Sequence, residues 1–255
     1  MTRWTALLLA GSRPGRDAFA EAHGVDLKAL IPIGGVPMVT RPAAALLGSP
    51  SIERVRVLAQ HPERIAAVLP SDQRLSVETS GATIAATLEA ILADPATRFP
   101  LLVTTADHAL LDGAMIGEFC AAAKGADLAI GMVERRALMS RLPQSRRSWY
   151  SFRGGAFSGA NLFAFGSRDA IKAVSLWRAV EQDRKTGWRM IAALGLPLLL
   201  GAVLRLRTLD QTLAAIGRRL GLDIRKVELS DPLAAVDVDK PADHQLVTKI
   251  LEGTA

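Results

Sequence analysis

The chain has 255 residues, 49% of them hydrophobic and 22% charged, which fits one α/β domain with a full core and does not require a second domain. Its single cysteine, Cys120, excludes an internal disulfide, and no apolar run reaches the roughly 20 residues that span a bilayer, so we expect a cytoplasmic protein. The formal net charge of +6 favours anionic partners, but an aromatic content of only 5% argues against nucleic acid and favours phosphorylated small molecules.

Short apolar runs alternate with amphipathic stretches along the whole chain, which is typical of a parallel or mixed sheet covered by helices. The predicted strands are 4–10, 54–59, 75–78, 99–105, 127–132, 161–165 and 224–229. The predicted helices are 36–47, 62–68, 82–92, 113–124, 168–181, 188–205, 209–220 and 241–251. The sequence contains no internal repeat and no long linker, so we predict one domain over residues 1–255.

The first predicted strand runs into a loop of small residues that carries cations. Residues 7–16 read LLLAGSRPGR, and a second apolar run, residues 28–38, reads KALIPIGGVPM. Backbone N–H groups can approach a nucleotide closely in a loop of this kind, and its basic side chains neutralise phosphate oxygens. The candidate nucleotide contacts are Leu9, Ala10 and Gly11, and the candidate cations are Arg16 and Lys28.

A single acid, Asp107, follows the apolar strand that we expect at the centre of the sheet. Ligands bind α/β sheets at the carboxyl ends of their strands, and a carboxylate there is a natural Mg²⁺ ligand. The alternative is a helix cap or an ordinary loop acid. Asp112 suits the capping role better, so we interpret Asp107 as functional.

A second group of acids precedes the last predicted helix. Asp237 and Asp239 alternate with valines, which places both on one face of an extended segment. Pro241 then starts the helix, and Asp243 lies in its first turn, where it complements the helix dipole. The alternative is an ordinary helix start without a ligand.

Two further motifs contain small or polar residues at the ends of elements. A helix that begins behind Ser80 and Gly81 could donate N–H groups to a base or a phosphate, or Ser80 could simply cap that helix. Asn161 precedes an apolar run, where it contacts a substrate or merely stabilises a turn.

These motifs, in this order, resemble nucleotidyltransferases of the nucleotide-diphospho-sugar transferase superfamily, which has a GT-A-like fold and includes NTP transferases similar to the molybdenum-cofactor guanylyltransferase. The family signature is roughly L-A-G-G-x-x-x-R followed by K-x-L-x-x-x-G-x-P-M/L, here with Ser12 in place of the second glycine and a longer loop over 17–26. The resemblance implies a three-layer α/β/α sandwich around a mostly parallel mixed sheet.

The resemblance also implies roles for the candidate residues. Asp107 and Asp239 would hold Mg²⁺, with Asp237 in reserve, because Pro241 and Asp243 match the family's D-x-D/N-T-P-E-D-L element. Lys28 and Arg16, with Asp107, would act in catalysis by stabilising charge on a nucleoside triphosphate. Ser80 and Gly81 would contact the base, and Asn161 would face a phosphorylated acceptor (a sugar, polyol or cofactor phosphate), which attacks the α-phosphorus and releases pyrophosphate.

Two alternatives stay open: a glycosyltransferase that uses a nucleotide sugar on the same fold, and a non-catalytic regulator at a membrane. The acceptor and the base (cytidine, uridine or guanosine) are not determined by the sequence. Residues 177–189 contain two tryptophans and Lys185, beside the apolar stretch 188–205. This block fits a peripheral contact with an anionic membrane, a homodimer contact, or an ordinary helix without a special partner.

Overall fold

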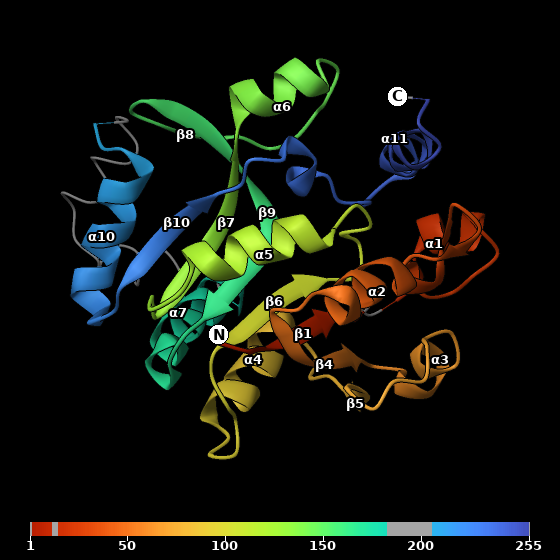
Figure 1. The fold of residues 1–255 in the computed structure, drawn as a ribbon, viewed down its shortest axis with the longest axis horizontal. Coiled ribbons are helices and arrows are strands. Elements are labelled where there is room, and N and C mark those ends of the chain that lie inside the picture. Colours follow the sequence, from red (N-terminus) through yellow and green to blue (C-terminus); the bar gives the residue numbers. More distant parts are fainter. Residues whose placement is uncertain (1, 12–14, 183–205, 255) are drawn as a thin grey trace.

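A computed structural model of the protein describes residues 2–11, 15–182 and 206–254. Its main sheet has the strand order β10-β7-β9-β6-β1-β4-β5, with β8 paired to β9 (Figure 1). The strands are β1 (Trp4–Leu9), β4 (Ile52–Ala59), β5 (Leu75–Thr79), β6 (Leu101–Thr105), β7 (Leu128–Glu134), β8 (Tyr150–Phe152), β9 (Gly155–Phe165) and β10 (Ile224–Glu228). Strand β9 runs antiparallel to β6 and β7, whereas the pairs β1–β4, β1–β6, β4–β5 and β7–β10 are parallel. The mixed, mostly parallel sheet that we predicted is therefore confirmed.

Helices cover both faces of this sheet. The α-helices are α1 (Ala18–Ala22), α2 (Thr40–Gly48), α3 (Pro62–Ala66), α4 (Ile84–Ala93), α5 (Gly113–Ala122), α6 (Arg135–Arg141), α7 (Ile171–Gln182), α10 (Leu209–Leu220) and α11 (Pro241–Leu251). The 3₁₀ helices are η1 (Lys28–Leu30), η2 (Arg168–Ala170) and η3 (Pro232–Ala235). Among the described residues, no helix is both long and apolar enough to cross a membrane.

The alternation along β1 separates two hydrophobic cores, one on each face of the sheet. Ala6 and Leu8 belong to the core that packs under α2 and α5, whereas Leu7 and Leu9 belong to the core under α4, α7 and α10. Figure 1 shows α2 and α5 in front of the sheet and α4 and α7 behind it. All four residues are at most 9% exposed, because a central strand is covered on both faces. The architecture is the predicted three-layer sandwich.

The carboxyl ends of β1, β4 and β6 point toward one edge of the molecule, the side that carries α1 and α11 (Figure 1). These strands are parallel neighbours, so the loops that follow them meet at that edge. Gly11, Gln60 and Asp107 lie in these three loops. The fold thus gathers the residues after three strands at the point where α/β sheets bind ligands.

Several predicted boundaries differ from the structure. The predicted helix 36–47 begins only at Thr40, because Gly34 and Gly35 adopt positive φ angles of 57° and 80° and turn the chain into a short hairpin of β2 (Pro32–Ile33) and β3 (Val36–Pro37). The polar, arginine-rich stretch 135–153, for which no strand or helix was predicted, contains α6 and β8. The predicted helix 188–205 lies outside the described residues, as do residues 183–189 of the block considered for a membrane or dimer contact; the start of that block belongs to α7.

Candidate functional site

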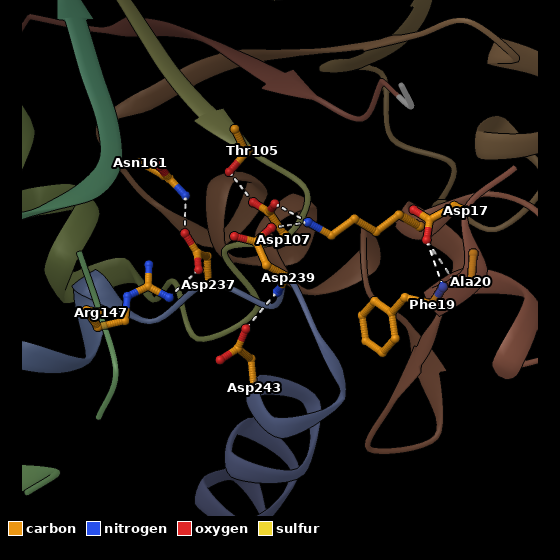
Figure 2. Close-up of polar contacts among 11 residues, drawn as sticks. Asp17, Phe19, Ala20, Thr105, Asp107, Arg147, Asn161, Asp237, Asp239 and Asp243 are labelled. Atoms are coloured by element: carbon orange, nitrogen blue, oxygen red, sulfur yellow. Dashed lines mark hydrogen bonds and ion pairs between the residues drawn. The ribbon is translucent and has the colours of Figure 1, made fainter. Parts of the chain in front are cut away.

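Lys28 lies between two carboxylates that are far from it in the sequence. Its Nζ donates hydrogen bonds to Asp107 Oδ2 at 2.7 Å and to Asp239 Oδ1 at 2.5 Å. The side chains of Lys28 and Asp107 are 22% and 20% exposed, whereas that of Asp239 is 61% exposed. Figure 2 shows the carboxylates of Asp107 and Asp239 next to each other. The structure thus brings together the lysine and the two acids that the sequence singled out.

Both acids are positioned by hydrogen bonds of neighbouring residues, one from a side chain and one between backbone groups. Asp107 follows β6, and the hydroxyl of Thr105 donates a hydrogen bond to its Oδ1. The backbone N–H of Val238 donates to the carbonyl of Asp107 at 3.0 Å, which ties the segment before α11 to the end of β6. Val238 is buried, as the alternating pattern predicted, so Asp239 faces away from the core.

The electrostatics of this group favour charged forms. Burial by itself would lower the pKa of Lys28, but the charges and hydrogen bonds of Asp107 and then Asp239 outweigh burial and raise the pKa above its ordinary value. Lys28 is therefore an ammonium ion at neutral pH. Its positive charge lies between the two carboxylates, where a metal ion could otherwise bind.

The same two carboxylates fit a magnesium ion. Mg²⁺ prefers oxygen ligands and is usually held by one or two carboxylates, with substrate phosphates and water completing its shell. Asp107 and Asp239 already place one oxygen each on a single cationic nitrogen. Within the described ranges, no group of three or more acidic, histidine or cysteine side chains could hold a metal ion. A Mg²⁺ ion held by these two carboxylates would complete its shell with substrate phosphates and water.

Asp237, the reserve ligand, faces other partners. Arg147 Nη1 forms an ion pair with Asp237 Oδ1, and Asn161 Nδ2 donates to Asp237 Oδ2 at 3.0 Å (Figure 2). Burial would raise the pKa of Asp237, but the hydrogen bond and the charge of Arg147 lower it below its ordinary value. Asp237 is therefore a carboxylate whose two oxygens are both engaged. Arg147 was only one of six arginines in the stretch 135–153 that the sequence left undifferentiated.

A β-bulge directs Asn161 toward this aspartate. Ile130 pairs with Phe163 and Met132 with Gly159, so three residues of β9 oppose the single residue Gly131 of β7. Asn161 has φ 48° at the centre of the bulge, a conformation that asparagine tolerates better than most residues. The sequence had suggested that Asn161 begins a strand. The structure instead places it within β9.

A cavity of about 480 Å³ opens beside Asp237 and Asp239. Its wall includes strands β7 and β9, the stretch around Arg147 and the segment that leads into α11. The basic side chains on its wall are Arg146, Arg147 and Lys240. Asn161 also lines it, together with the apolar side chains of Ile130, Met132 and Phe163. Three acids, Asp237, Asp239 and Asp243, line it as well, so the cavity combines charges of both signs with apolar surface.

On the other side of the site, the glycine loops after β1 and β5 meet at Gln60. A Cβ atom on Gly11 would lie 3.0 Å from Gln60 Nε2 and 3.1 Å from Gln60 Oε1, and Nε2 donates to the carbonyl of Gly81 at 3.4 Å. Gln60 was not predicted from the sequence, because nothing in its local pattern indicates that it spans two loops.

In the loop after β5, the N–H groups of Ser80 and Gly81 are themselves paired within the protein. Ser80 N–H donates to Ala59 O at 2.9 Å, and Gly81 N–H donates to Thr87 Oγ1 at 3.0 Å. The N-cap of α4 is Thr83, whose hydroxyl accepts from Ala86 N–H, so the interpretation of Ser80 as the cap was wrong. Ser80 Oγ is buried and has no hydrogen-bond partner among the described residues, which leaves it as a group that could bind a ligand.

The loop after β1 is only partly described, but its ends are clear. Ala10 N–H donates to Leu58 O, and the carbonyl of Leu9 accepts from Ala106 N–H, so both residues extend the sheet. The inserted residues form α1, which is capped by Asp17. The side chain of Arg16 is 88% exposed and pairs with Glu21 at 2.6 Å. The structure thus does not bring Arg16 to Lys28.

Comparison with protein families gives one match that spans most of the chain. The model of the MobA-like NTP transferase domain matches residues 6–222. No curated protein sequence matches the chain.

Solved structures with similar folds include three that cover nearly the whole chain. A hypothetical transferase from Thermus thermophilus is 28% identical, with a TM-score of 0.78, over 95% of this chain and 100% of that one. The 4-diphosphocytidyl-2C-methyl-D-erythritol synthase of Anaerococcus prevotii is 10% identical, with a TM-score of 0.64, over 98% and 96%. A homologue of Mycobacterium tuberculosis rv0371c from Mycobacterium sp. strain JC1 is 15% identical, with a TM-score of 0.53, over 98% of each chain. At 10% and 15% identity, the last two show likeness of fold.

Proposed function

Because this chain belongs to the MobA-like NTP transferase family, we propose that it transfers a nucleoside monophosphate from a nucleoside triphosphate to a phosphorylated acceptor. The acceptor is a small molecule such as a sugar, polyol or cofactor phosphate. The observation that carries the proposal is the arrangement of Lys28 between Asp107 and Asp239. Transfer of this kind depends on positioning and charge stabilisation, and this group supplies both a cation and oxygen ligands.

The reaction needs no covalent intermediate on the protein. An oxygen of the acceptor phosphate attacks the α-phosphorus, and the bond from that phosphorus to the β-phosphate oxygen breaks. Pyrophosphate then leaves with the electron pair of the broken bond. Mg²⁺ held by Asp107 and Asp239 would neutralise charge on the triphosphate and fix its geometry.

The protein's own residues bind and orient the two substrates. Lys28 neutralises triphosphate oxygens, and Arg16 adds charge once it leaves its exposed pair with Glu21, which contributes little stability. Leu9, Ala10, Gly11, Ser80 and Gly81 form the wall of the nucleotide site. We assign the phosphorylated acceptor to the cavity that Asn161 lines, because the basic side chains of Arg146 and Lys240 in its wall can bind a phosphate.

Thermal unfolding with ligands tests this proposal. The wild type, Asp107→Ala and Asp112→Ala are heated with CTP, UTP, GTP or ATP, with and without Mg²⁺. We expect one triphosphate with Mg²⁺ to raise the Tm of the wild type and of Asp112→Ala but not of Asp107→Ala. Asp112 is the matched control because its carboxylate caps α5 by accepting from Met115 N–H, so its loss lowers stability but spares the site.

The outcome also decides between the alternatives. Release of pyrophosphate with a phosphorylated acceptor would then establish the reaction class. Nucleotide sugars are tested in the same way, and a rise in Tm with these ligands alone would establish the glycosyltransferase instead. No shift with any of these ligands would favour the non-catalytic regulator.

A further inference from the structure

Two carboxylates and one ammonium group share the centre of the site. The Nζ of Lys28 lies 2.7 Å from Asp107 Oδ2 and 2.5 Å from Asp239 Oδ1, so it uses two of its three N–H donors on them. The group is partly shielded from water, since Lys28 and Asp107 are each about four-fifths buried. A charge in this position interacts more strongly with its neighbours than it would in bulk water.

A divalent cation needs the oxygens that Lys28 already holds. Mg²⁺ and similar ions bind carboxylate oxygens at about 2.0–2.1 Å, a contact that an ammonium at hydrogen-bond distance from the same oxygens obstructs. The two cations also repel each other. Either the lysine leaves the carboxylates, or the metal does not bind there.

If Lys28 left Asp107 and Asp239, the neighbouring acids Asp237 and Asp243 would not be ready replacements, because they already have partners in the described part of the chain. Both oxygens of Asp237 are engaged by Arg147 and Asn161. One oxygen of Asp243 accepts from the backbone N–H of Asp239. A triphosphate, in contrast, would bring several anionic oxygens to the ammonium at the moment when it brings the metal.

We propose that Lys28 occupies the cation position between Asp107 and Asp239 in the nucleotide-free protein, so that a divalent cation binds together with the nucleoside triphosphate and not before it. The inference rests on the proposed function, since it takes these acids as the metal ligands. Lys28 then has two successive partners: the carboxylates before the nucleotide binds and the triphosphate afterwards. The four methylenes of its side chain allow the ammonium to change partners while η1 stays in place.

Binding of Mn²⁺, followed by electron paramagnetic resonance of the free ion, tests the inference without any catalytic readout. It is measured with and without the α,β-methylene analogue of the triphosphate that stabilises the wild type. We expect Lys28→Met to bind Mn²⁺ alone about 10- to 100-fold more tightly than the wild type, in the range of other changes beside metal ligands. With the analogue, we expect the wild type to bind Mn²⁺ tightly.

Four variants control for charge, location and folding. Lys28→Arg keeps the positive charge and should bind Mn²⁺ alone as weakly as the wild type. Lys28→Met/Asp107→Asn should lose the tighter Mn²⁺ binding expected of Lys28→Met. That loss would show that the ion binds at these acids. Lys172→Met removes an exposed lysine of α7 and should change nothing. Lys28→Gln replaces Lys28→Met if the latter does not fold.

The outcomes separate this inference from the function on which it rests. Equal affinity of the wild type and Lys28→Met for Mn²⁺ alone would overturn the role of Lys28 but leave the metal site intact. Failure of both proteins to bind Mn²⁺ even with the analogue would overturn the metal site itself, and the inference with it.

Discussion

Arg147 and Asp237 form an ion pair across 90 positions of the sequence, in the wall of the cavity beside the candidate site. Their side chains are only 16% and 13% exposed, and Asn161 donates to the other oxygen of the aspartate. The pair fixes one side of the cavity and gives Asp237 a guanidinium partner, whereas Asp107 and Asp239 pair with the ammonium of Lys28. The two acids of the Asp237–Val238–Asp239 segment therefore have different tasks, although they share one face of the chain.

Loss of Arg147 should destabilise the protein more than loss of both partners. Arg147→Met leaves a buried carboxylate without its cation, which typically costs about 3–5 kcal/mol of unfolding free energy. Arg147→Met/Asp237→Asn removes the charge as well, and we expect it to recover much of that loss. Urea unfolding of the single and double variants measures the coupling. Additive effects of the two substitutions would contradict the prediction.

Replacing Gly11 by alanine should weaken nucleotide binding but leave the chain able to fold. The methyl group of Gly11→Ala would meet the flexible end of Gln60, so the chain still folds but the amide is displaced from the Gly81 carbonyl. We expect the Kd of the nucleotide to rise by roughly tenfold, which is about 1.4 kcal/mol. Calorimetric titration of the triphosphate measures this change.

The matched control is Gly48→Ala, at the last residue of α2. A Cβ atom there meets nothing within 4 Å, and its φ does not lie in the left-handed region. It should leave the Kd unchanged and raise stability by about 0.5 kcal/mol. The same rise in Kd for both variants would show that the effect is not specific to Gly11.

The buried ring of His108 should make stability depend on pH. Burial lowers the pKa of His108 to about 4, below its ordinary value of 6.5. The unfolded chain therefore takes up a proton near pH 6.5, whereas the folded chain does so only near pH 4. The stability that the neutral ring provides is complete above pH 6.5 and decreases as the pH falls toward 4.

Urea unfolding at pH 7.5 and pH 5 measures this effect. We expect the unfolding free energy of the wild type, relative to His108→Gln, to fall by about 2 kcal/mol between these values. A constant difference between the wild type and His108→Gln would refute the prediction.

The single cysteine should be inert in the folded protein. Cys120 is buried on α5, and burial raises the pKa of its thiol to about 12, so almost no thiolate exists at neutral pH. We expect iodoacetamide to label Cys120 only when the chain opens, at a rate that increases with urea. Labelling of the native protein as fast as a free thiol would contradict this burial.

The helices α10 and α11 follow the sequence prediction to the residue, because local signals fix their ends. Gly221 adopts a left-handed φ of 66° directly after α10, and Pro241 begins α11. The hairpin around Gly34 was missed, since Pro37 suits the first turn of a helix as well as a short strand. Which form it takes depends on the tertiary contacts of the neighbouring residues.

In the candidate site as well, residues marked by local sequence signals could be predicted, whereas those whose role depends on distant partners could not. Asp107 follows the end of a strand and Asp239 precedes the start of a helix, so the positions of both could be predicted from these elements. Arg147 could not be distinguished from its neighbouring arginines, because its partner Asp237 lies far along the chain. The role of Gln60 likewise depends on two loops that meet only in the folded sheet.

The distance of 211 positions between Lys28 and Asp239 also has a consequence for synthesis on the ribosome. The first half of the chain carries the glycine loop and the lysine, but their second acid is made last, just before α11. A nascent chain therefore exposes an incomplete site, which lacks one of the two carboxylates until the segment at Val238 joins the end of β6. Assembly of the site therefore requires synthesis as far as Asp239, so a chain that stalls before this point would be unable to form it.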